Sequence, residues 1–160
     1  MKTLLAACML LIACAVQADQ PPSDQQIVDR YCAKADTQAD MNQCAQDAVS
    51  AADKELNATY QAVLKKWAAY PVMLDKLRQS QRQWLSYRDA DLKARFAIED
   101  GEGAERGTAY PAAYAFYQAS LERERTARLC EYLRGTAYGE RDSAPCAELV
   151  KHPLIVPNTH

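Results

Sequence analysis

Glycine is scarce in this chain and unevenly placed. The sequence has 160 residues but only five glycines, and all of them lie between Gly101 and Gly139. The first hundred residues therefore contain none, and alanine, glutamine and charged residues that favour helices take their place. Apolar residues make up 49% and charged residues 25% of the chain, which is typical of one globular domain and argues against disordered or collagen-like classes. The composition predicts an all-α protein.

Histidine is nearly absent, which limits the chemistry that the chain can perform. The two histidines, His152 and His160, both lie in the C-terminal tail. No histidine is therefore placed among helical carboxylates or serines, as a hydrolytic triad or a metal site of His and acidic residues requires. We expect no catalytic site, no metal ion and no other cofactor. The alternative enzymatic function is hydrolysis of envelope glycans by a pair of carboxylates.

Positive charge is not in excess either. The formal net charge is −2, so broad nucleic-acid binding has no electrostatic basis. Acidic residues gather instead in the glycine-rich segment that follows the second long apolar pattern: Glu99, Asp100, Glu102 and Glu105. This acidic loop is either a solvated turn or a negative surface that steers a basic partner.

Long hydrophobic runs are missing except at the N-terminus. Residues 1–18 have one basic residue, an apolar run from Leu4 to Val16 and a small-residue site, which is the layout of a secretory signal peptide cleaved before Asp19. In the alternative interpretation, residues 11–14 form a lipobox and Cys14 is acylated, which anchors the protein to a membrane. The apolar run is shorter than the roughly 20 residues of a membrane span, so we expect no transmembrane helix.

The cysteines support export independently of the leader. Apart from the two cysteines in the leader, the chain has an even set, Cys32, Cys44, Cys130 and Cys146. In an oxidising compartment these predict two disulfides. Three connectivities are possible, and we favour the pairs close in sequence, Cys32 with Cys44 and Cys130 with Cys146. A four-cysteine metal site is the alternative, but the chain has no CxxC spacing.

Apolar residues recur at intervals of three and four, which predicts three long amphipathic helices. They cover residues 37–70, 71–99 and 110–134, with short helices at 23–34 and around Cys146. Thr37 and Asp40 fit a capping box, Pro71 fits a first turn, and Gly135 fits a helix stop. We expect an elongated bundle over residues 19–135, followed by a tail, residues 136–160, that the second disulfide ties down.

Polar residues interrupt the apolar stripe of the second long helix. Gln81 and Arg88 lie seven residues apart and share a face with Trp84. A buried arginine needs a carboxylate partner, and Asp53, one turn from Asn57 on the first long helix, is the best candidate. Arg125 on the third long helix raises the same question. These six residues form either a buried ion pair that sets helix register or a polar groove open to a partner.

Between Cys32 and Leu133 the chain contains a series of spaced elements: Cys32, Met41-Asn42 with Cys44, Ala52-Asp53 with Leu56-Asn57 and Tyr60, Gln81, Trp84, Tyr87-Arg88-Asp89, and Arg125 with Leu129. Through these elements the chain resembles the LprI-type lysozyme inhibitor family of exported bacterial domains. The combination AAD..LN..Y followed by Q..W..YRD is fairly specific. The family usually has two further cysteines, where this chain has Leu92 and Tyr117, and Cys130 with Cys146 resembles a replacement.

The resemblance implies a secreted or lipid-anchored domain that binds a protein, because the characterised member of the family blocks lysozyme. We therefore expect a periplasmic, non-catalytic binding protein that inhibits lysozyme or another peptidoglycan-lytic enzyme. The alternative is a structural or stress adaptor of the cell envelope that binds another periplasmic protein. An acidic helical protein suits a basic lysozyme as its partner.

Overall fold

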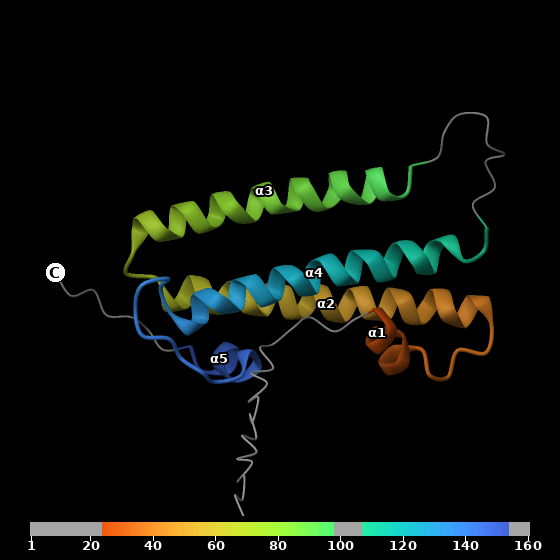
Figure 1. The fold of residues 1–160 in the computed structure, drawn as a ribbon, viewed down its shortest axis with the longest axis horizontal. Coiled ribbons are helices and arrows are strands. Elements are labelled where there is room, and N and C mark those ends of the chain that lie inside the picture. The colour runs from red at the N-terminus through yellow and green to blue at the C-terminus, as the bar shows by residue number, and fades with distance from the viewer. Residues whose placement is uncertain (1–23, 98–106, 154–160) are drawn as a thin grey trace, which may run out of the picture.

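The computed structural model describes residues 24–97 and 107–153, and within these ranges the chain folds into five α-helices and no strand (Figure 1). The all-α prediction is confirmed, and so are the three long helices. The helices are α1 (Asp24–Tyr31), α2 (Gln38–Lys66), α3 (Pro71–Arg95), α4 (Tyr110–Arg134) and α5 (Cys146–Lys151). The leader, Cys14, the acidic loop residues Glu99, Asp100, Glu102 and Glu105, and the last residues of the tail lie outside the described residues.

The start of α2 follows from a local hydrogen-bond pattern. The Thr37 hydroxyl accepts a hydrogen bond from the Asp40 amide at 3.1 Å, and the Asp40 carboxylate accepts one from the Thr37 amide at 3.0 Å. This is the predicted capping box, which satisfies amides that the first helical turn leaves free. The hydrogen bonds from Thr37 lower the pKa of Asp40, because they stabilise its ionised form.

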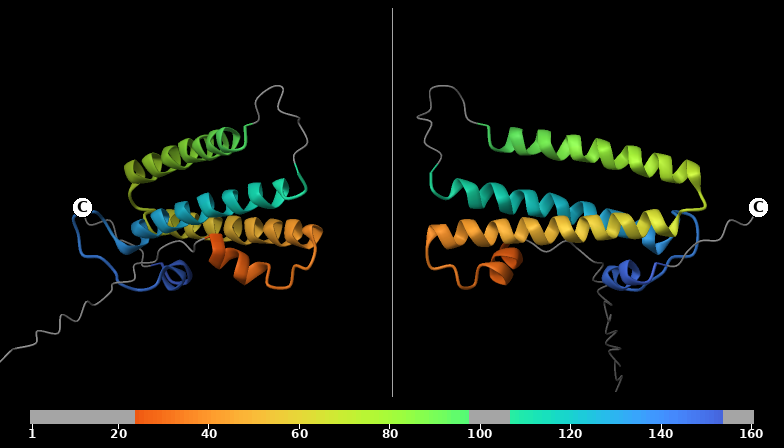
Figure 2. Two further views of the ribbon diagram at one scale, coloured as in Figure 1. Left: turned by 45° about the vertical axis from the view of Figure 1, so that its right-hand side comes forward. Right: turned by 180° about the vertical axis from the view of Figure 1, so that it is seen from behind.

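Helices α2 and α4 pack together along their length, and small side chains make this possible. Their contact surface contains a row of buried alanines: Ala45, Ala48 and Ala52 on α2, and Ala112, Ala115 and Ala119 on α4. Alanines let two helix backbones approach closely, since no longer side chain separates them. The two helices lie side by side in all views and run in the same direction (Figure 2).

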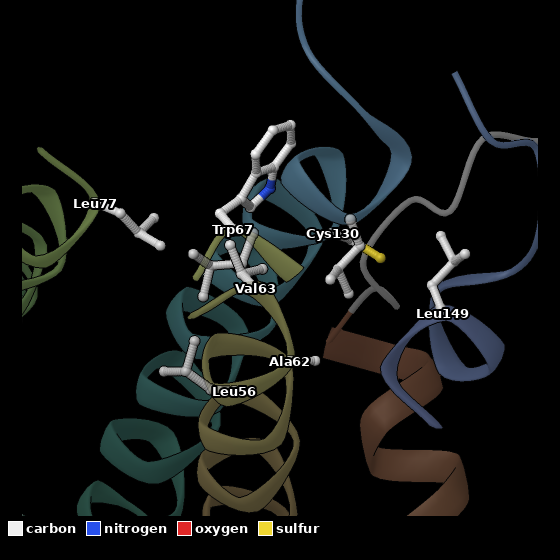
Figure 3. Packing of buried hydrophobic residues seen from close by; sticks show 9 residues of the cluster. Leu56, Ala62, Val63, Trp67, Leu77, Cys130 and Leu149 are labelled. Atoms are coloured by element: carbon white, nitrogen blue, oxygen red, sulfur yellow. The ribbon is translucent and has the colours of Figure 1, made fainter. Parts of the chain in front are cut away.

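Larger side chains form the main core at the C-terminal ends of α2 and α4. Leu129 and Leu133 of α4 pack in a cluster with Leu56, Val63 and Trp67 of α2. Leu149 of α5 joins the same cluster, and Figure 3 shows Leu77 pointing toward it from α3. Lys66 and the Trp67 indole donate hydrogen bonds to the carbonyls of Leu133 and Tyr132, which would otherwise be free at the end of α4.

Two disulfides link the short helices to the long ones. Cys32 is bonded to Cys44, which ties α1 to α2, and Cys130 is bonded to Cys146, which ties α5 to α4. Both predicted pairs are confirmed. None of the described helices is long and apolar enough to cross a membrane.

Helix α3 buries little of its surface, unlike α2 and α4. It runs beside α4 in the opposite direction (Figures 1 and 2), but of its residues only Leu77 and Leu92 are buried. Leu85, which shares the apolar stripe in the sequence, is 38% exposed. The polar side chains that share this stripe therefore contribute much of the contact between α3 and α4.

Candidate functional site

Polar and aromatic side chains join α3 to α4, and we call this group the polar seam. It consists of four predicted residues and one that the sequence did not reveal: Gln81, Trp84 and Arg88 on α3, and Glu122 and Arg125 on α4. Gln81 and Arg88 are two helical turns apart, so both face α4. The sequence analysis correctly placed them on one face, but the surface opposite them belongs to α4 rather than α2.

Arg125 is held in one orientation from several sides. Its Nε donates to Gln81 Oε1 at 2.9 Å, and its Nη2 donates to Ser80 Oγ at 3.1 Å. Its guanidinium carbon lies 5.8 Å from the centre of the Trp84 ring, within the range of a cation–π contact. The side chain is buried, and the loss of hydration lowers the pKa of Arg125. These side chains therefore hold the charged guanidinium group of Arg125 in a fixed position, and it forms no ion pair with any described carboxylate.

Arg88 pairs with Glu122 and not with Asp53. Its Nη1 lies 3.3 Å from Glu122 Oε1, and its Nε and Nη2 lie 3.0 and 2.8 Å from Asp89 Oδ1. The predicted Arg88–Asp53 pair is therefore wrong. The physical reason is the placement of α4, which puts Glu122 directly opposite Arg88, while α3 makes few contacts with α2. The structure does agree with the expectation that Arg88 has a carboxylate partner, because it contacts the buried Glu122.

Glu122 is the residue of the seam that sequence reasoning missed. It is 1% exposed, and its Oε1 accepts hydrogen bonds from Arg88 and from Gln118 at 2.9 Å. Its Oε2 is buried and accepts no hydrogen bond from any described residue. The spacing of Glu122 and Arg125, three residues apart on one helix, was the available signal, because it puts both on one face.

Burial raises the pKa of Glu122, since removal from water disfavours the charged carboxylate more than Arg88 and Gln118 stabilise it. Asp53 adds to the effect through its negative charge, so it lies within electrostatic range of Glu122. The folded state therefore takes up a proton at Glu122 more readily than the unfolded chain does. Its contribution to stability grows as the pH falls from neutral toward 4.5, the ordinary value for this group.

We expect the Glu122→Gln variant to reveal this titration. Glutamine keeps the shape of the side chain but does not ionise. The free energy of unfolding of the unchanged protein, minus that of the variant, should therefore become more positive between pH 7.5 and pH 5. Urea unfolding followed by circular dichroism at the two pH values measures the difference. A free-energy difference that stays constant or changes in the opposite direction would contradict a raised pKa of Glu122 in the folded protein.

Asp53 and Asn57 form a separate pair on α2. Both are exposed, and Asn57 Nδ2 donates to Asp53 Oδ2 at 3.0 Å. Among the described residues, neither side chain has another hydrogen bond or an ion pair. The structure thus separates the six predicted residues into four in the seam and two on the surface.

Near Leu92 and Tyr117, non-covalent contacts connect α3 and α4. Tyr117 donates a hydrogen bond from its hydroxyl to Asp91 at 2.7 Å, which raises the pKa of Tyr117. Its ring lies 5.8 Å from that of Phe96, and Leu92 is buried one residue after Asp91. This end of α3 is therefore fastened by a tyrosine–aspartate hydrogen bond and aromatic packing.

The described residues bring together no group of three histidine, cysteine, aspartate or glutamate side chains that could hold a metal ion. The seam instead offers hydrogen-bond donors, one buried carboxylate and an indole face. Such groups suit binding and orientation of a partner or of the helices themselves.

The fold and its seam define a class of small, disulfide-linked helical proteins in which polar contacts hold one helix against a tightly packed pair. The chain belongs to the family described as lysozyme inhibitor LprI, whose family model matches residues 30–129. It is also 34% identical over 146 residues to an uncharacterised protein of Rhizobium meliloti (strain 1021), R02472, covering 83% of this chain and 96% of that protein. No solved structure matches the chain.

Proposed function

We propose that this protein is an exported binding protein that inhibits a lysozyme or another peptidoglycan-lytic enzyme. The observation that carries the proposal is the match of residues 30–129 to the lysozyme inhibitor family. The two disulfides support a role in an oxidising compartment, where such bonds persist. The net charge of −2 supports association with a basic enzyme, because opposite charges speed the encounter of two proteins.

The surface proposed to contact the enzyme contains Asp53 and Asn57. Both belong to the AAD..LN..Y pattern through which the chain resembles its family, yet both side chains are exposed. Burial in the core therefore does not account for them. A carboxylate and an amide held 3.0 Å apart offer acceptors and a donor in a fixed arrangement, which suits recognition of arginine or lysine side chains on a basic enzyme.

The test is the lysis of a bacterial wall suspension by lysozyme, followed as a fall in turbidity. We expect the oxidised protein to slow lysis by at least one type of lysozyme at micromolar concentration. The double variant Asp53→Ala and Asn57→Ala should inhibit at least tenfold more weakly, because it removes the proposed contacts without opening the core. Circular dichroism should show an unchanged helical content for this variant.

A matched control lies on the same helix. Gln43 and Asp47 form a second exposed amide–carboxylate pair with the same four-residue spacing and a hydrogen bond of 3.1 Å. Replacing both of these residues with alanine should leave inhibition unchanged. Equal loss in the two double variants would refute the assignment of the contact surface. No slowing of lysis with several lysozyme types at micromolar excess would refute inhibition of lysozyme.

A further inference from the structure

A pocket lies at the C-terminal end of α4, apart from the Asp53–Asn57 pair. It has a volume of about 560 Å³, and its walls come from the start of α3, the last turns of α4 and the segment after α4. Positive side chains predominate among the charged residues of its lining. Three arginines, Arg125, Arg128 and Arg141, face one glutamate, Glu131. A positive pocket of this kind is unexpected on a protein whose net charge is −2.

The charge in the pocket is only partly neutralised. Glu131 accepts hydrogen bonds from Arg134, at 2.6 Å, and from Arg141, so its negative charge is shared between two arginines. Arg128 has no hydrogen bond or ion pair with any described residue. Arg125 directs Nε and Nη2 to Gln81 and Ser80, and none of the described side chains accepts a hydrogen bond from its Nη1. Arg125 and Arg128 therefore retain donors for an anion.

The two arginines are close enough to repel each other. They lie three residues apart on one helix, and the charge of Arg128 contributes to the lowered pKa of Arg125. Bringing two guanidinium groups together costs free energy, and the burial of Arg125 increases this cost. An anion bound between them would attract both guanidinium groups and so offset this repulsion.

The remaining walls are largely apolar and are held in place by the fold. Met73 and Tyr132 line the pocket together with Ala137. The wall after α4 turns at Gly135, where φ is 144° and an added Cβ would lie 2.6 Å from the Glu140 carbonyl oxygen, so glycine is required there. The Asp142 amide then donates to the Arg134 carbonyl at 2.8 Å, and Arg141 returns to Glu131. The pocket is therefore formed before any ligand arrives.

We propose that this pocket binds a carboxylate carried on an apolar body, with the C-terminal end of a peptide and a free carboxylic acid as its two sources. Arg125 and Arg128 hold the carboxylate, and Met73 and Tyr132 contact the apolar part. Arginine binds carboxylates and phosphates through paired hydrogen bonds. The partial neutralisation by Glu131 and the apolar walls favour a singly charged carboxylate over a doubly charged phosphate. Because Gln81, Ser80 and Trp84 already fix Arg125, little conformational freedom is lost on binding.

The test is isothermal titration calorimetry on the oxidised protein with four probes. They are the dipeptide N-acetyl-phenylalanyl-leucine with a free carboxylate, the same dipeptide as its amide, octanoate, and phenyl phosphate. The free dipeptide or octanoate should bind saturably, and whichever of them binds more tightly identifies the source of the carboxylate. The amide should bind at least tenfold more weakly than the free dipeptide. Tighter binding of phenyl phosphate than of both carboxylates would overturn the proposal.

Two variants locate the binding site. Arg128→Gln should weaken binding at least tenfold. Because Arg128 is exposed and its charge repels Arg125, this variant should unfold at no lower a temperature than the unchanged protein. Arg82→Gln is the matched control, since Arg82 is an exposed arginine of α3 that does not line the pocket. Equal binding by the Arg128→Gln variant and the unchanged protein would overturn the proposal, and so would the absence of binding by either carboxylate. The experiment involves no lysozyme, so its outcome is independent of the proposed inhibition.

Discussion

Replacing Leu129 with alanine is expected to lower the free energy of unfolding by about 4 kcal/mol. Leu129 lies on α4 with no exposed surface and packs in the cluster that contains Leu56, Val63 and Leu133. Removing its outer carbons loses the free energy of burial and leaves a cavity, which together cost roughly 2 to 5 kcal/mol at a buried leucine. Domains of this size have total stabilities of about 5 to 15 kcal/mol, so the loss is a large fraction.

The matched control is Leu85→Ala on α3. The chemical change and the helical context are the same, but Leu85 is 38% exposed, so less apolar surface is lost and the space it leaves is open to water. The expected loss is below about 1 kcal/mol. Urea unfolding of the oxidised protein, followed by circular dichroism, measures both variants. Equal losses would contradict the central position of α4 and the loose packing of α3.

Replacing Arg88 with alanine is expected to lower the free energy of unfolding by about 2 to 3 kcal/mol at neutral pH. The variant leaves the buried Glu122 carboxylate with Gln118 as its remaining hydrogen-bond partner among the described residues. It also removes the contact of Arg88 with the Trp84 ring, at 5.6 Å. The cost stays near the lower limit for a broken buried pair, because Glu122 can take up a proton.

Asp53→Ala should change stability by less than about 0.5 kcal/mol, because Asp53 is exposed and pairs with Asn57. The contrast between Asp53→Ala and Arg88→Ala therefore tests which carboxylate is the partner of Arg88. A double-mutant cycle of Arg88→Ala with Glu122→Gln isolates the coupling between the two side chains. The double variant should lose less stability than the sum of the two single variants. Strict additivity, or a large loss for Asp53→Ala, would contradict the Arg88–Glu122 pair.

Local features of the sequence predicted the helices well. The capping box of Thr37 and Asp40, the proline at position 71 and the glycine at position 135 act within one or two helical turns, and each marks an observed helix end. The cysteine pairs were predictable for a related reason. Cys32 with Cys44 and Cys130 with Cys146 are separated by only 12 and 16 residues, so the chain joins them at a small cost in conformational entropy.

The partners across the bundle were not predictable in this way. An apolar stripe shows that a helix face is buried but does not show which helix covers it. From the sequence alone, either Asp53 on α2 or Glu122 on α4 could therefore be the ion-pair partner of Arg88. Leu85 illustrates the same difficulty, because it shares the stripe of Leu77 and Leu92 and is nevertheless exposed. The resemblance to a family identified four of the five residues of the polar seam, without Glu122 and without the contacts that the residues make.

By itself the sequence determined the fold class and the positions of the helices, and it favoured the two observed disulfides among three connectivities, because each depends on residues close together in the chain. Only the tertiary structure decided that Glu122 is the buried partner of Arg88, that Asp53 and Asn57 remain on the surface, and that Arg125 and Arg128 line a common pocket. These outcomes depend on how α3 lies against α4. That placement results from the sum of many weak contacts between distant residues, which no local pattern records.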